Sequence, residues 1–93
     1  MTEQQKTSTK KFILRGDPKI ALSIMKKGFE LGLEPQDWTV EGNYADRYLE
    51  LTFKSEVGHK YLKRIITRMK KNKNFYISGN TKDGIVFEEK RYD

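Results

Sequence analysis

The amino-acid sequence predicts an α+β domain with the element order β-α-β-β-α-β and one further strand near the C-terminal end. Short stretches of alternating apolar and polar residues have the period of half-buried strands, and two longer stretches carry apolar residues at helical spacing. In a single short domain, this order most economically gives a ferredoxin-like (split βαβ) sandwich. We therefore expect two helices on one face of an antiparallel sheet, with the last strand completing a C-terminal hairpin.

Length and composition limit the chain to one small domain. It has 93 residues, of which 34% are charged and 35% are hydrophobic, and eleven aromatic residues supply bulky area for a core. Cysteine is absent, which excludes a disulfide framework and thiolate metal sites. Residues 1–9 lack apolar side chains after Met1, so we expect a flexible tail followed by one domain over residues 10–93. The sequence shows no signal peptide or membrane span, and we expect a cytoplasmic protein.

The first strand is predicted over Lys10–Arg15, where alternation places Phe12 and Leu14 on one side. The opposite phase would bury two charged residues. Gly16 is expected to end this strand.

The first helix is predicted from Pro18 to about Leu31. Asp17 can cap its free N–H groups, and proline is tolerated at the first helical position. Gly32 suits the left-handed position after a helix, and Pro35 prevents continuation. More than half of the helix circumference is apolar: Ile20, Ala21, Leu22, Ile24, Met25, Gly28, Phe29 and Leu31.

Two more strands are predicted over Trp38–Glu41 and Arg47–Lys54, with a turn marked by Gly42-Asn43. In the second of these strands the alternation is clear, with Leu49, Leu51 and Phe53 on the core side.

The second helix is predicted over Ser55–Lys73, with Ser55 as its N-cap. Gly58 should weaken its first turn unless another backbone packs closely there. Residues 54–73 hold eight basic residues and one acidic residue, a net charge of +7, whereas the other 73 residues sum to −1. The net charge of +6 is therefore concentrated on one helix.

A terminal hairpin follows, formed by a strand around Phe75–Ser78 and a strand over Ile85–Glu89. The dipeptides Gly79-Asn80 and Asp83-Gly84 predict a loop of about four to six residues between them. Ten residues are expected to share one core: Phe12, Leu14, Ile24, Leu49, Leu51, Phe53, Leu62, Ile65, Met69 and Phe75.

The first functional hypothesis is phosphate-directed binding of RNA or DNA by the basic helix. Its polar arc carries no acidic residue after Glu56, whereas an ordinary solubilising face would interleave Glu with Lys. The candidate nucleic-acid-binding residues are Lys60, Lys63, Arg64, Arg68, Lys70 and Lys71. The alternative is that these side chains form a solvated helix face.

The open face of the sheet is a weaker candidate for the same function. Tyr48 and Tyr76 are expected there and could stack on bases, as aromatic side chains do in RNA-recognition domains. However, Glu50 is expected at the middle one of the three outward positions of this strand, between Tyr48 and Thr52, where it would repel phosphate. Ordinary cross-strand packing of the two tyrosines is the alternative.

The second hypothesis is a protein-interaction module, such as a small inhibitor or adaptor, for example one encoded by a virus. It would act through the first helix or the open sheet, as a homodimer or with another protein, and its candidate residues are Leu22, Met25, Phe29, Tyr48 and Tyr76. Completion of the core is the alternative role of the helical residues. Exposure of Met25 and Phe29 would favour this module over nucleic-acid binding.

We do not expect an enzyme. His59 is the only histidine, and the acidic residues are scattered over caps, turns and a strand, with no spacing that would bring two carboxylates together or hold a metal. The sequence therefore predicts no catalytic residue, metal site or cofactor.

Overall fold

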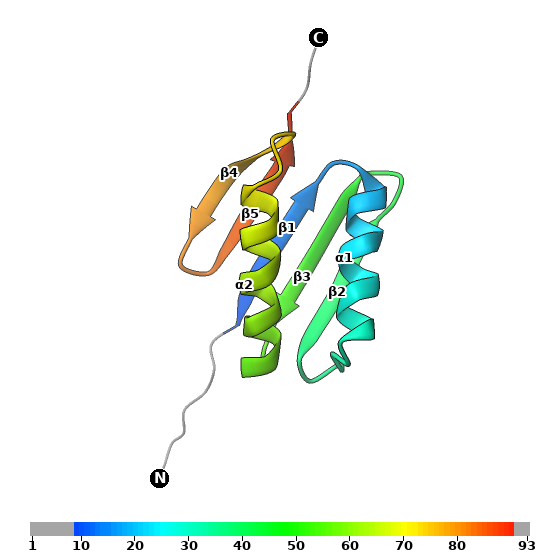
Figure 1. Cartoon of the computed structure of the whole chain (residues 1–93), viewed down its shortest axis with the longest axis vertical. Coiled ribbons are helices and arrows are strands. Elements are labelled where there is room, and N and C mark those ends of the chain that lie inside the picture. The colour runs from blue at the N-terminus through cyan, green and yellow to red at the C-terminus, as the bar shows by residue number, and fades with distance from the viewer. Residues whose placement is uncertain (1–8, 91–93) are drawn as a thin grey trace.

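The protein forms two layers, a five-stranded sheet and two helices that both lie on one face of it (Figure 1). This computed structural model describes residues 9–90, so the predicted tail lies outside the described residues except for Thr9, as do residues 91–93. The elements are β1 (Lys10–Arg15), α1 (Pro18–Glu30), β2 (Trp38–Asn43), β3 (Tyr48–Phe53), α2 (Glu56–Lys70), β4 (Phe75–Thr81) and β5 (Gly84–Glu89). The predicted α+β class and element order are confirmed.

The strand order β2-β3-β1-β5-β4 differs from the predicted ferredoxin-like order. The strand after α2 should lie beside β1 in that fold, but β4 forms the outer edge and β5 lies between it and β1. Because β1 and β5 are parallel while the other neighbours are antiparallel, the sheet is mixed and the predicted antiparallel sheet is corrected.

Burial explains why β5 takes the inner position. Its two alternate apolar residues, Ile85 and Phe87, are both buried, and the Phe87 ring lies 5.7 Å from that of Phe12. By contrast, β4 buries Phe75 but leaves Ile77 39% exposed, and Ser-Gly-Asn follows. The strand that can cover more apolar area therefore lies under α2.

The ends of α1 follow the predicted signals. Asp17 accepts a hydrogen bond from the Lys19 N–H at 2.9 Å, and Gly32 adopts the left-handed region with φ of 87°. The N–H groups of Gly32 and Leu33 return to the carbonyls of Phe29 and Gly28 at 3.0 and 3.1 Å. These bonds close the helix in the manner of a Schellman motif.

The first turn of α2 packs against the segment before β2. Ser55 accepts a hydrogen bond from the Gly58 N–H and donates one to Asp37 Oδ1 at 2.6 Å. A Cβ atom at Gly58 would lie 2.4 Å from the Asp37 carbonyl oxygen. The close backbone approach that the sequence required of Gly58 is therefore present.

Both turns are shorter than predicted, because the glycines expected to begin them belong to strands. Gly42 and Asn43 belong to β2, and the chain reverses over residues 44–47 instead. Likewise, Gly79 and Asn80 pair within β4, so the terminal hairpin has a two-residue turn at 82–83 and not the predicted loop. A Cβ atom at Gly42 would lie 2.6 Å from the Tyr48 carbonyl oxygen, which explains a glycine inside this strand.

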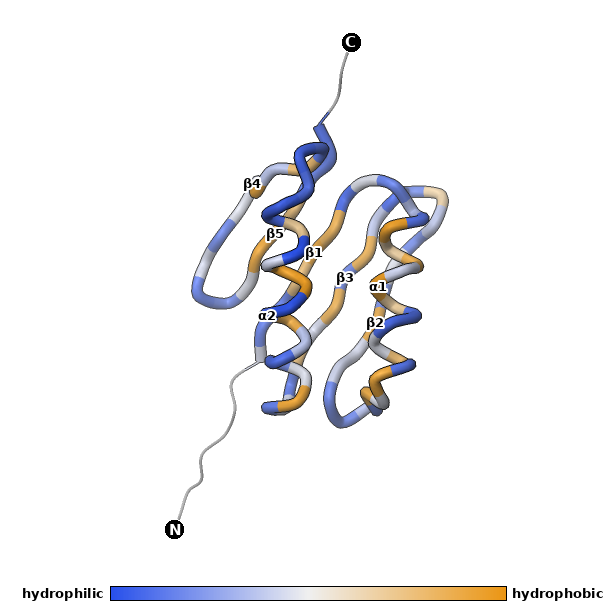
Figure 2. The backbone as a smooth tube through the Cα atoms, viewed as in Figure 1, coloured by the Kyte–Doolittle hydropathy of each residue, from blue (hydrophilic) through white to orange (hydrophobic). Residues whose placement is uncertain are grey.

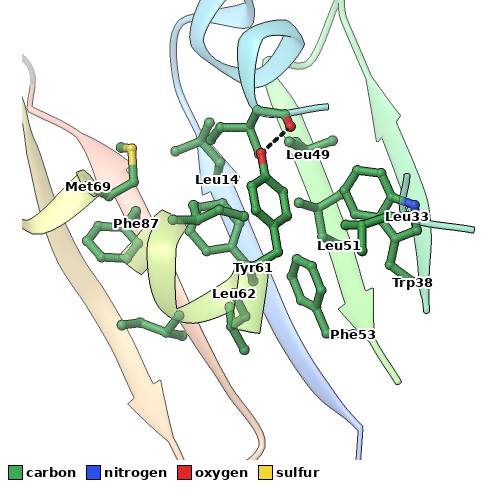
Figure 3. Packing of buried hydrophobic residues seen from close by; sticks show 14 of the residues in the cluster. Leu14, Leu33, Trp38, Leu49, Leu51, Phe53, Tyr61, Leu62, Met69 and Phe87 are labelled. Atoms are coloured by element: carbon green, nitrogen blue, oxygen red, sulfur yellow. Dashed lines mark hydrogen bonds between the residues drawn. The ribbon is translucent and has the colours of Figure 1, made fainter. Parts of the chain in front are cut away.

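The core lies between the sheet and the helices, and all ten predicted members are buried (Figure 3). Trp38, Leu33, Tyr61, Ile85 and Phe87 complete it. Hydrophobic and hydrophilic residues alternate along the strands and helices, while the C-terminal end of α2 is strongly hydrophilic (Figure 2). Within residues 9–90, neither helix is long and apolar enough to cross a membrane.

Candidate functional site

The basic side chains of α2 and of its C-cap residue, Lys71, are exposed and unpaired. Within residues 9–90 there are two ion pairs, Lys11–Glu50 and Arg47–Glu89, and neither involves this helix. The side chains concerned are those predicted from the sequence: Lys60, Lys63, Arg64, Arg68, Lys70 and Lys71. Their charges are therefore available to an external anion.

A groove between α1 and α2 concentrates positive charge. It has a volume of about 730 Å³ and is lined by five basic side chains and one acidic side chain, together with Leu22, Ser23, Tyr61 and Ile65. Its charged residues are Lys19, Lys26, Lys27, Glu30, Arg64 and Arg68. We call this surface the basic groove. Because both walls are positively charged, an anionic chain lying in it would meet cations on two sides.

The six predicted nucleic-acid-binding residues do not all belong to the basic groove. Arg64 and Arg68 line it, whereas Lys63 and Lys70 lie on the opposite side of the polar arc at 100° per residue. By the same spacing, Lys60 and Lys71 point between these two directions. The sequence thus identified a basic helix, and the structure divides its charges between two directions.

Tyr61 sets the relative position of the groove walls. Its buried side chain reaches from α2 to α1, where the hydroxyl donates a hydrogen bond to the Ile24 carbonyl oxygen at 2.6 Å (Figure 3). Burial raises the pKa of Tyr61 above its ordinary value of 10.0, and the nearby Arg68 and Arg64 oppose this rise. The phenol is therefore neutral at pH 7 and fixes α2 against α1 beneath the two arginines.

Sequence reasoning missed the α1 wall of the basic groove. Lys19, Lys26 and Lys27 belong to the narrow polar strip of α1, which carries only one acidic residue in the groove, Glu30. The composition of that strip was a usable signal. However, periodicity shows which side of a helix is polar and not which other helix lies beside it.

The open face of the sheet carries a polar network. The Tyr48 hydroxyl donates a hydrogen bond to Glu50 at 2.5 Å, and Lys11 Nζ lies 3.0 Å from the other carboxylate oxygen of Glu50. The Arg15 guanidinium carbon lies 5.7 Å from the centre of the Tyr48 ring. Tyr48 therefore already has a cation over its ring and an acceptor for its hydroxyl.

Tyr48 and Tyr76 do not form a joint stacking platform. The strand register places Arg15 and Glu88 between them in one row across the sheet, so three strand spacings of about 4.8 Å separate the two tyrosines. Tyr76 is 45% exposed on the edge strand β4, and the carboxylate of Glu50 stands beside Tyr48. This arrangement gives base stacking on the open face little support.

The polar network gives a pH-dependent contribution to stability. Hydrogen bonding from Tyr48, followed by Lys11, lowers the pKa of Glu50 below its ordinary value of 4.5. A lowered folded-state pKa stabilises the fold above the unfolded-state pKa, and this contribution is lost as the pH falls through the folded-state value. The wild type should therefore lose stability between about pH 5 and pH 3, and the Glu50→Gln variant, which lacks this carboxylate, should lose less over the same range. Urea unfolding at several pH values measures the free energy of unfolding of the wild type and of this variant. Tyr48→Phe, which removes one of the hydrogen bonds to Glu50, should have an intermediate effect. A pH dependence in Glu50→Gln equal to that of the wild type would contradict the prediction.

The side of α1 towards β2, next to the basic groove, is apolar and partly exposed. Leu22 is 52% exposed and Phe29 is 58% exposed, whereas Met25 is half-buried against the core. The Phe29 ring contacts that of Trp38 edge to face, with 5.3 Å between the centroids. The exposure condition for a protein-interaction surface is therefore met by Phe29 and only partly by Met25. Tyr48 and Tyr76, the other predicted partner residues, lie on the opposite face of the sheet.

His59 and the carboxylates form no reactive cluster in the part of the chain that the structure describes. His59 is half-buried, and its Nε2 lies 3.3 Å from the Phe53 carbonyl oxygen. Across residues 9–90, no group of three or more His, Asp or Glu side chains could hold a metal ion.

Comparison of the chain with models of known protein families, with curated proteins and with solved structures finds no match.

Proposed function

We propose that this protein is a non-enzymatic nucleic-acid-binding protein that contacts phosphates mainly through the basic groove. The observation that carries the proposal is the groove itself, in which cations from two helices face a common space with one carboxylate among them. Such charge attracts polyanions and supplies the sequence-independent part of nucleic-acid affinity. A solvated surface helix would explain the charges on α2, but it would not require the cations of α1 to face the same space.

The proposed contacts are to phosphates and not to base edges. Within α2 the exposed polar surface consists mainly of Lys and Arg, and it offers no Asn or Gln to read a base edge. Phosphate contacts position a protein without reading sequence. Binding should therefore vary little between sequences of equal length.

The experiment compares two variants of equal net charge. The groove variant replaces Lys19, Lys27, Arg64 and Arg68 with Gln. The control variant replaces with Gln the four predicted residues that do not line the groove, Lys60, Lys63, Lys70 and Lys71. All eight positions are exposed, so both variants should fold. Fluorescent RNA and DNA oligonucleotides are titrated with each protein at several salt concentrations.

Four phosphate contacts in the groove would give log K a slope against log salt of about −3 to −4. The groove variant should lose most of this slope and bind more weakly, whereas the control variant should retain most of both. Equal losses would mean that net charge alone governs binding. Wild-type affinity no greater than that of an unrelated protein of equal charge would remove the basic groove as a functional site.

A second candidate function is protein interaction through the apolar side of α1. The exposure of Leu22 and Phe29 beside an edge strand favours it. This surface adjoins the basic groove, since Leu22, Lys26 and Glu30 line both.

A further inference from the structure

The two edges of the sheet differ in how they are protected. On β4 the register shifts between Ile77 and Gly79, a bulge that disfavours pairing with another strand. On the other edge, β2 pairs with β3 through all six residues without irregularity. Its sequence, WTVEGN, contains neither the lysine nor the proline that commonly protects an edge. The outer side of β2 is therefore suited to accept another strand.

Apolar side chains of α1 lie directly beside this edge. Phe29 contacts Trp38 at one end of β2. Further along, Leu22 and Met25 line a cavity of about 320 Å³ together with Val40 and Gly42. A partner that added only a strand would leave these α1 side chains exposed. A suitable partner must bring a strand and an apolar helix at the same spacing, and a second copy of this chain supplies both.

The sequence of β2 allows one favourable antiparallel register with a second copy. When Val40 lies opposite Val40 of the other copy, Thr39 lies opposite Glu41 and Trp38 opposite Gly42. A shift of one residue would place the helix-covered side chains of one copy on the open face of the other. A shift of two residues in one direction places Glu41 opposite Glu41, and in the other direction Glu41 opposite Asp37, and both pair like charges.

The same register brings the apolar side chains of the two α1 helices together. Within one copy, Phe29 lies by Trp38 and Leu22 lies near Gly42. Pairing Trp38 with Gly42 of the other copy therefore brings Phe29 of the first copy towards Leu22 of the second. The charged residues that line these surfaces are also balanced, with Lys26 and Arg47 against Glu30 and Glu41. Although the chain has a net charge of +6, two copies can therefore approach at this face without net repulsion.

We propose that the protein forms a two-fold symmetric homodimer through antiparallel pairing of β2 with β2 of a second copy. The dimer has one continuous ten-stranded sheet, with all four helices on the same face and the α1 helices adjacent at the centre. This inference specifies the partner for the second proposed function and is independent of nucleic-acid binding. Both basic grooves would lie on the helical face of the dimer, one on each side of the central helix pair.

Opposite charges introduced at one exposed position test the register. Thr39 and Glu41 are both exposed, so substitution of Thr39 should leave the monomer folded. In the proposed dimer, Thr39→Lys creates two attractive pairs with Glu41, and Thr39→Glu creates two repulsive pairs. The dimer Kd should fall for Thr39→Lys and rise for Thr39→Glu, by about two- to thirtyfold each.

The measurement is sedimentation equilibrium of the full chain over a wide concentration range. Phe29→Asp should yield a folded monomer, with folding checked by circular dichroism. A wild-type protein that stays monomeric would overturn the proposal, as would a dimer whose Kd moves in the same direction in both Thr39 variants. Binding of another protein at this surface by a monomeric chain would also overturn it. Nucleic-acid titration of the same variants is a separate readout, since none of them removes a basic residue.

Discussion

Leu51→Ala is expected to lower the free energy of unfolding by about 2–5 kcal/mol. Leu51 is fully buried in the central strand β3, opposite Phe12 of β1 and Val40 of β2, and it faces the helical layer. Truncation removes apolar contacts on all sides and leaves a cavity that the surrounding strands cannot readily close. This loss is a large fraction of the stability of a domain of this size.

The matched control for Leu51→Ala is Tyr48→Ala on the same strand. Tyr48 points to the open face and is half-buried, so its loss removes one hydrogen bond and a cation contact but opens no cavity in the core. Urea unfolding followed by Trp38 fluorescence should show a much smaller effect for this variant. Equal losses in both variants would mean that the two faces of the sheet are wrongly assigned.

Gly58→Ala is expected to destabilise the protein by about 1–3 kcal/mol, as overpacking of a well-packed site does. In an ordinary helix interior this substitution stabilises by roughly 1 kcal/mol, so the expected sign is reversed. The new methyl group would lie 2.4 Å from the Asp37 carbonyl oxygen. That carbonyl also accepts a hydrogen bond from the Lys54 N–H at 2.9 Å, and the Asp37 side chain holds Ser55, so this backbone cannot move away easily.

Thr67→Ala provides the control, because Thr67 is an exposed residue of the same helix. It should be neutral or slightly stabilising, in accord with helix propensity alone. Thermal unfolding of both variants separates the two effects. A stabilised Gly58→Ala protein would show that the first turn of α2 can move away from the segment before β2.

The element order was predictable because each strand and helix has its own local pattern. Alternation located β3 through Leu49, Leu51 and Phe53, and capping residues located both helices. Glycine was less informative about turns. Gly42 and Gly79 both read as turn residues, yet both lie in strands, since a glycine serves a tight turn and a close backbone approach equally well.

The strand order was not predictable from the order of elements alone. Both β4 and β5 have the alternation of a strand, and their relative burial decides which one lies beside β1. The two alternate apolar residues of β5, Ile85 and Phe87, are both buried, whereas Ile77 of β4 is exposed, and this difference indicates that β5 is the inner strand. The second strand of a hairpin can lie on the inner side, as β5 does here, so the apolar content of both strands has to be compared to predict their order.

The candidate site was predictable on one side only. The excess of Lys and Arg on α2 is visible in the sequence, but the basic groove also requires Lys19, Lys26 and Lys27 of α1. Their position depends on how the two helices lie over the sheet, with Tyr61 joining them at Ile24. That arrangement is a property of tertiary packing, and no pattern within a single helix specifies it.

The inner position of β5 has a consequence for the order of folding. Lys11 in β1 pairs with Gly84, so one side of this central strand stays open until almost the last described residues have joined the sheet. Closing so long a loop costs chain entropy before any contact compensates for it, and such topologies fold slowly. During synthesis, residues 10–70 would leave the ribosome before Phe87, whose ring packs beside that of Phe12. The nascent chain should therefore reach its native packing in one late step and not by successive addition of finished units.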